Sequence, residues 1–141
     1  MSNYAYVATR ARSRRSRLLP AEAYNQLLNL EHAEIARYIQ DLEYRREIDR
    51  YGSTLSGADL IETALVDNLA KDVGDFLSFS KGKLRDILHV YAEKYRIENL
   101  KNIVRGINQN MDKQNLERLV CPINDSDKEL YSKLYDSKTV E

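Results

Sequence analysis

Apolar residues recur at steps of three and four along most of the chain, which is the spacing of one face of an α-helix. The longest run of this kind predicts a helix from Ser56, a good amino-terminal cap, to about Phe79. No segment alternates with a period of two over the length of a strand. We therefore expect an all-α fold, an irregular bundle of about seven helices. Besides residues 56–79, helices are expected within residues 4–18, 20–30, 31–42, 44–52, 84–107 and 126–135.

The stretch over residues 84–107 carries two apolar stripes that do not share one helical face. The stripes are Leu84, Ile87, Leu88, Tyr91 and Tyr95, and then Leu100, Ile103, Val104 and Ile107. Continuing the first stripe from Tyr95 leads to Glu98 and Asn99, which are polar. Because a straight helix cannot bury both stripes against one neighbour, we expect a kink or a short break near Arg96–Glu98.

The apolar pattern weakens after Gly106. Residues 116–120 suggest one or two further helical turns, which Pro122 stops. Ser126 and Glu129 have the spacing of a capping box ahead of a last helix. We expect that helix to have little of its own to pack on.

Basic residues are concentrated at the start of the chain. Residues 1–20 hold five arginines and no acidic residue, whereas the other 121 residues carry 17 basic and 22 acidic ones. On a helix, Arg10, Arg14 and Arg17 lie on one face. That face could be a solvated edge with local ion pairs, a docking surface for an acidic partner, or a nucleic-acid site. The last is disfavoured, because the rest of the chain is acidic and no aromatic residues are interleaved with these arginines.

A second basic pair lies near the end of the long stretch. Lys101 and Arg105 are four residues apart, so their charges repel on one helical face. We expect a carboxylate to answer them, most simply from Asp67, Asp72 or Asp75.

Residues with chemical potential are scattered. His89 has Asp86 and Glu93 at helical spacing, but a di-iron site needs a second Asp- or Glu-x-x-His copy, so we interpret His89 as a surface residue. His32 lacks the second histidine of a zinc helix, and Cys121 has no base nearby in sequence. The five glycines form no phosphate-binding loop. We therefore expect no catalytic, cofactor or metal residues, and a chain that is not an enzyme by itself.

The single cysteine cannot form an internal disulfide, which favours a reducing compartment. No apolar run approaches the ~18–20 residues of a membrane span, and no signal peptide is visible. We expect a protein that is soluble, or peripheral to a membrane at most.

Four stretches, in order, resemble the central-stalk subunits of V-type and A-type ATPases, called C in archaea and bacteria and d in eukaryotes. They read YAYVATRARSRRSRLL, QDLEYRREID, IETALVDNLAKDVGDFLSF and YRIENLKNIVRG. The last is the most specific, because it matches the family's pattern of an aromatic residue, Asn-Leu-Lys and a later arginine. Asn99, Lys101 and Arg105 stand at the matched positions.

The resemblance implies a fold of three similar helical repeats arranged as a funnel. The chain resembles only the first repeat, residues 1–109, with a connecting segment and the start of a second repeat over residues 110–141.

The resemblance also implies a function, that of a non-catalytic rotor subunit. A protein of this kind couples the ATP-hydrolysing or ATP-synthesising head to the ion-translocating membrane ring, with protons or sodium as the ion. The implied partners are the central axle subunits and the membrane rotor ring, on the cytoplasmic face of the membrane. Arg10, Arg14 and Arg17 would then face another rotor element.

Two other classes of protein remain open. One is a generic helical adaptor that binds partner helices through Ala8, Ala11 and the face of Arg10. The other is a nucleic-acid-binding helical domain led by residues 10–17.

Overall fold

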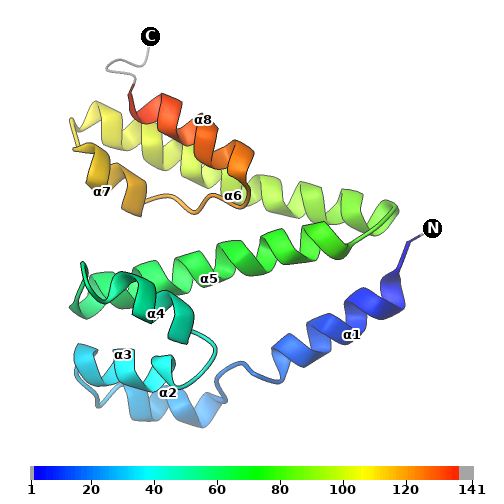
Figure 1. Cartoon of the computed structure of the whole chain (residues 1–141), viewed down its shortest axis with the longest axis horizontal. Helices are drawn as coiled ribbons and strands as arrows, with labels where there is room; N and C mark the ends of the chain where they lie inside the picture. The colour runs from blue at the N-terminus through cyan, green and yellow to red at the C-terminus, as the bar shows by residue number, and fades with distance from the viewer. Residues whose placement is uncertain (1, 137–141) are drawn as a thin grey trace. The chain divides into compact units, whose positions relative to one another are not determined.

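The computed structural model describes residues 2–136 and contains helices and no strands over that range (Figure 1). The predicted all-α class is confirmed, with eight helices in the described residues where about seven were expected. They are α1 (Tyr4–Arg15), α2 (Ala21–Leu27), α3 (His32–Gln40), α4 (Arg45–Tyr51), α5 (Gly57–Phe79), α6 (Lys83–Asn108), α7 (Lys113–Arg118) and α8 (Asp125–Tyr135).

The chain divides into two compact units, with the boundary inside α5. The amino-terminal unit is Tyr4–Leu69. The carboxy-terminal unit is Met1–Asn3 with Ala70–Glu141, of which residues 2–3 and 70–136 are described. This division follows packing, and the repeat boundary at residue 109 stays a prediction.

The core of the amino-terminal unit is a small apolar cluster from α3, α4 and the start of α5. Its buried members are Ala36, Ile39, Ile48, Leu60 and Ala64. The partly buried rings of Tyr38, Tyr44 and Tyr51 pack against it. These rings supply apolar area that small and medium side chains alone would lack.

The carboxy-terminal unit is organised around the second half of α6. α8 lies alongside this half, and α7 also contacts α6 (Figure 1). Ile103 of α6, Val120 and Tyr131 of α8 form the core, with Tyr131 only 1% exposed. The expectation that the last helix would have little to pack on was therefore wrong, because its apolar partners come from α6.

The start of α8 also differs from the prediction. Asn124, in place of Ser126, is the amino-terminal cap, and its Oδ1 accepts a hydrogen bond from the backbone N–H of Asp127 at 2.8 Å. Asparagine is among the strongest caps, so the helix begins earlier than the Ser126–Glu129 spacing suggested.

α6 is one uninterrupted helix of 26 residues, so the predicted break near Arg96–Glu98 was wrong. Its buried residues share one face, and only one of them, Ile103, belongs to the two apolar stripes described above. They are Ala92, Asn99, Ile103 and Gly106. Ile87 and Tyr91 of the first stripe stay exposed, so they need no second neighbour. One continuous helix suffices when one face is covered and another is left open.

Gly106 allows α7 to approach α6 closely. A Cβ atom at this position would clash with the side chain of Leu116, which is buried. A side chain at position 106 would therefore force Leu116 to move. Gly106 does not end the helix, which continues to Asn108.

The turn between α5 and α6 is held by the start of the chain. Gly82 adopts φ +60°, a left-handed value that glycine tolerates. The Asn3 side chain donates to the Phe79 carbonyl at 2.8 Å and accepts from the Lys81 N–H at 2.9 Å. One amide thus satisfies two backbone groups left unpaired where α5 ends.

Within residues 2–136, none of the helices is long and apolar enough to cross a membrane.

Candidate functional site

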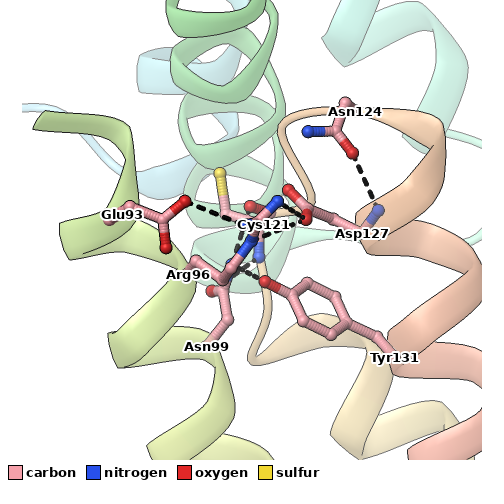
Figure 2. A network of polar contacts seen from close by, with 7 residues as sticks. All are labelled: Glu93, Arg96, Asn99, Cys121, Asn124, Asp127 and Tyr131. Atoms are coloured by element: carbon pink, nitrogen blue, oxygen red, sulfur yellow. Dashed lines mark hydrogen bonds and ion pairs between the residues drawn. The ribbon is translucent and has the colours of Figure 1, made fainter. Parts of the chain in front are cut away.

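Asn99 joins α6 to the segment that precedes α8 (Figure 2). Its Oδ1 accepts from the backbone N–H of Cys121 at 3.0 Å, and its Nδ2 donates to the carbonyl of Cys121 at 2.8 Å. Nδ2 also donates to the hydroxyl of Tyr131 at 3.2 Å. Asn99 is 5% exposed, so an unanswered amide there would be costly, and these three bonds satisfy it.

Arg96 makes the second link between α6 and α8. Its Nε and Nη2 donate to Oδ1 of Asp127 at 2.9 and 2.6 Å, and its Nη1 donates to Glu93 at 2.7 Å. The Asp127 side chain is 3% exposed, whereas that of Arg96 is 34% exposed. The hydrogen bond to Asp127 raises the pKa of Arg96, and burial opposes this more weakly. A carboxylate this deeply buried depends on its cation, because an unpaired buried charge is strongly destabilising.

These contacts form two hydrogen-bonded sets, one around Arg96 and one around Asn99, and the charges of Arg96 and Asp127 act on Tyr131 of the second set. We call the two sets together the polar bracket. Its members are Glu93, Arg96, Asn99, Cys121, Asn124, Asp127 and Tyr131 (Figure 2). Three come from α6 and the others from α8 and the segment before it.

The polar bracket is suited to positioning helices. Both donors and the acceptor of Asn99 are engaged, as are Nε, Nη1 and Nη2 of Arg96. Burial raises the pKa of Tyr131, and the hydrogen bond that its hydroxyl oxygen accepts from Asn99 opposes this more weakly. The arrangement therefore fixes the orientation of α8 on α6, and it presents no nucleophile with an adjacent base.

The three residues that match the family pattern lie in different surroundings in the structure. Asn99 points into the polar bracket, whereas Lys101 and Arg105 are exposed. Lys101 pairs with Glu98 of its own helix at 3.0 Å, and this hydrogen bond lowers the pKa of Glu98. The expected carboxylate from Asp67, Asp72 or Asp75 is thus not what answers Lys101, because Glu98 lies one turn away.

Arg105 has no ion pair among residues 2–136. The expected acceptor Asp67 is engaged with Arg50 at 3.2 Å within the amino-terminal unit. Arg105 and Lys101 instead line a shallow hollow of about 350 Å³ on α6, together with Ile97, Leu100 and Val104.

The arginine face of α1 is partly engaged by the chain itself. The guanidinium of Arg10 lies 5.1 Å from the ring centroid of Tyr6, and Arg14 is half-buried. Arg17 follows the end of α1 and pairs with Glu43 at 3.0 Å, with both side chains about half exposed. These contacts agree with local ion pairs at this edge and leave its role toward partners a prediction.

Ala8 and Ala11, which the adaptor alternative assigns to partner helices, are both exposed. Val7 is the buried residue of α1.

His89 and His32 are both exposed, and Glu93 is engaged with Arg96. Within the described part of the chain, no group of three or more His, Cys, Asp or Glu side chains could hold a metal ion.

Sequence reasoning missed Arg96, Asp127 and Tyr131 as partners. Arg96 and Asp127 are 31 positions apart, and no local spacing links them. A usable signal was present at Asn99, because an asparagine on the covered face of a long helix must find hydrogen-bond partners.

The fold and the polar bracket together define the class of protein. It is an all-helical protein in which buried polar contacts link its own helices to one another. The chain belongs to the ATP synthase (C/AC39) subunit family, whose model matches residues 7–141. The resemblance that the four sequence stretches carry is thereby confirmed.

Curated relatives agree with this assignment. The C subunit of the A-type ATP synthase of Haloferax volcanii is 38% identical over 140 residues, covering 99% of this chain and 40% of the relative. The protein of the same name from Methanosarcina mazei is 42% identical over 105 residues, covering 74% of this chain and 29% of the relative. That of Archaeoglobus fulgidus is 34% identical over 131 residues, covering 93% and 38%.

The chain thus spans at most about 40% of the length of these relatives. No solved structure matches it.

Proposed function

We propose that this chain acts as a non-catalytic part of the central stalk of a rotary ATP synthase. It would help to couple ATP turnover in the soluble head to the movement of protons or sodium through the membrane ring. The observation that carries the proposal is the family match over residues 7–141, with relatives named as the C subunit of A-type ATP synthases. The proposed partners are the central axle subunits and the membrane rotor ring, at the cytoplasmic face of the membrane.

The geometry of the carboxy-terminal unit supports a mechanical role. A continuous helix of 26 residues extends about 39 Å. Its second half is braced by the polar bracket and by the apolar core around Ile103 and Tyr131. A coupling element has to transmit force without bending, and cross-bracing of this kind stiffens a helix against its neighbour.

The proposal assigns Arg10, Arg14 and Arg17 to a contact with another rotor element. The support is the concentration of five arginines within residues 1–20 without an acidic residue. Exposed charges contribute mainly to the rate and orientation of association. Arg10→Glu should therefore slow assembly more at low salt than at high salt. Arg46→Glu, an equal charge change at an exposed position on α4, is the matched control and should have little effect.

Coupling can be tested in membrane vesicles that carry the complete complex. Removing the protein should abolish ATP-driven ion uptake while ATP hydrolysis by the head continues, and adding it back should restore uptake. Unchanged ion uptake in vesicles that lack the protein would overturn the proposal. Assembly of the protein with an unrelated set of partner helices, and not with the rotor, would favour the adaptor class instead.

A further inference from the structure

α1 is almost entirely exposed, and one of its faces has no role in the contacts described above. Val7 is its one buried residue, and Arg14 is half-buried. At 100° per residue, five exposed positions fall within an arc of about 100° that excludes Val7, Arg10 and Arg14. We call these five positions the Arg12 face, and they are Tyr4, Ala8, Ala11, Arg12 and Arg15.

The two arginines of the Arg12 face lack an ion pair within the described part of the chain. Arg17 pairs with Glu43, whereas neither the Arg12 nor the Arg15 side chain forms an ion pair or a hydrogen bond with any of residues 2–136. Residues 1–21 contain no acidic residue, so α1 itself offers no carboxylate to answer them. The Arg12 face therefore presents two cations and no anion.

The preference for arginine over lysine is confined to the first half of the sequence. All nine lysine or arginine positions before residue 71 are arginine, whereas nine lysines and four arginines follow from there on. Lysine would supply the same charge and solubility. Arginine differs in its planar fork of donors, which binds a carboxylate through two parallel hydrogen bonds, and it is enriched at protein interfaces where lysine is depleted. The arginines of α1 thus favour an interface over a solvated edge.

Among anionic partners, the Arg12 face favours a helix of another protein. A helix that lies on a bilayer buries a continuous apolar face, but α1 has no exposed aliphatic side chain larger than alanine. Nucleic acid would be repelled by the rest of the amino-terminal unit, because residues 18–69 hold ten acidic residues and four arginines. Alanines at positions 8 and 11 instead leave room for another helix backbone to come close. Two Arg12 faces would oppose arginine to arginine, which disfavours a second copy of the chain.

We propose that the Arg12 face docks an acidic α-helix of a partner protein. Carboxylates along one side of that helix accept paired hydrogen bonds from Arg12 and Arg15. Its backbone approaches α1 over the two alanines, and the ring of Tyr4 packs against one end. This surface is separate from the side of α1 that carries Arg10 and Arg14. The proposal rests on the proposed function only for the expectation that the partner is another subunit of the same complex.

The surface can be tested with the 141-residue chain and three stapled four-turn helices built on alanine. The first helix carries glutamates along one side, and the second carries the same number of glutamates spread around its circumference. The third has glutamine in place of each glutamate of the first. Fluorescence anisotropy should show the first helix binding about tenfold more tightly than the third, and more tightly than the second. Equal binding of the first and second helices would overturn the proposal, because net charge alone would then explain the attraction.

An exchange of arginine for lysine separates paired hydrogen bonds from charge. Arg12→Lys with Arg15→Lys keeps the charge of α1 and should leave the melting temperature unchanged, but it should weaken binding of the first helix about tenfold. Arg37→Lys with Arg46→Lys makes the same exchange at two exposed arginines outside α1 and should leave binding unchanged. Undiminished binding by the Arg12 and Arg15 double variant would overturn the proposal.

The other anionic partners are tested with the same chain. Vesicles of phosphatidylglycerol and phosphatidylcholine in equal parts, and a short DNA duplex, should each bind more weakly than the first helix at physiological salt. Tighter binding of the vesicles or of the duplex would overturn the proposal and assign the arginines to phosphate groups.

The source of the helix is tested in the assembled complex with a photo-crosslinking residue at position 8. The captured peptide should come from a helical segment of another subunit, with acidic residues along one side. A crosslink to a lipid, to a basic segment or to a second copy, or no crosslink, would overturn the inference. Because the synthetic helices bind without the rotary complex and ATP-driven ion uptake is measured separately, failure of the docking proposal can be told apart from failure of the proposed function.

Discussion

The two halves of α6 have similar apolar content but different surroundings. In the first half, Ile87, Val90 and Tyr91 remain exposed, and Ala92 is the buried residue. In the second half, Asn99 and Ile103 are covered by α8 and the segment before it. Apolar periodicity therefore shows where a helix can bury a face, whereas polar pairing shows where it does.

The difference has a physical cause in the partners that each half finds. Asn99 contacts residues 22 and 32 positions later, and Arg96 contacts a residue 31 positions later. Each of these bonds requires a specific geometry, so they determine which face of α6 meets α8. The side chains of Ile87 and Val90 carry no polar atom that could form a directional bond of this kind.

Removing the amide of Asn99 should have the largest effect on the free energy of unfolding. Asn99→Ala deprives the backbone of Cys121 and the hydroxyl of Tyr131 of their bonds, and we expect a loss of about 2–4 kcal/mol in unfolding free energy. Urea unfolding measures this loss. Asn102→Ala is the matched control, since Asn102 donates a single bond to the Leu119 carbonyl and should cost about 1 kcal/mol or less. Equal losses for the two variants would contradict the role assigned to Asn99.

Neutralising Asp127 should have the next largest effect on the free energy of unfolding. Asp127→Asn leaves Arg96 without its buried counter-charge, and we expect a loss of about 2 kcal/mol because Arg96 can still reach water. Asp125→Asn removes the exposed pair with Lys128 and should change stability by about 0–1 kcal/mol. If both variants unfold at the same urea concentration, the Arg96–Asp127 pair does not brace α8.

Alkaline pH should destabilise the covered half of α6 through Tyr135, which packs against its core. Burial raises the pKa of Tyr135 to about 12, so the folded chain retains the neutral phenol. Its contribution to stability is full below the ordinary pKa of about 10, and it is lost as pH rises through the folded value. Tyr135→Phe should make the decline in stability between these pH values shallower, and Tyr24→Phe, at an exposed position, should not. An identical decline in both variants would mean that Tyr135 is not held neutral by the fold.

Arg105 should matter least for folding. Because it has no ion pair among residues 2–136, Arg105→Ala should change the unfolding free energy by no more than about 0.5 kcal/mol. Thermal unfolding of the two proteins measures this directly. A loss above about 1 kcal/mol would show that Arg105 is paired in solution, as the repulsion from Lys101 first suggested.

Much of the helical framework could be predicted from the sequence. The apolar run that begins after Ser56 ends at Phe79, as expected, because local periodicity and a break at Gly82 determine both limits. The predicted break within α6 was wrong for a reason that periodicity cannot reveal. Counting apolar positions assumes that each stripe is buried, and the stripe with Ile87 is not.

The polar bracket could be predicted only in part. Asn99 was singled out through a family resemblance, without its partners. Asp127 and Tyr131 could not be linked to it, because contacts across 31 or 32 residues depend on how α8 lies on α6. The family could be assigned without these long-range contacts, because four short stretches in order indicated it. The match over residues 7–141 confirmed the assignment.

The central claim is that the amide of Asn99 ties the segment before α8 to α6. Amide hydrogen exchange of Cys121 tests it most directly, because that N–H lies outside any helix and bonds to Asn99 Oδ1. The account predicts that the Cys121 amide exchanges nearly as slowly as that of Ile103. It also predicts that Asn99→Ala accelerates exchange of the Cys121 amide far more than exchange of the Ile103 amide. Exchange of Cys121 at the rate of an unstructured chain while Ile103 stays protected would contradict the account.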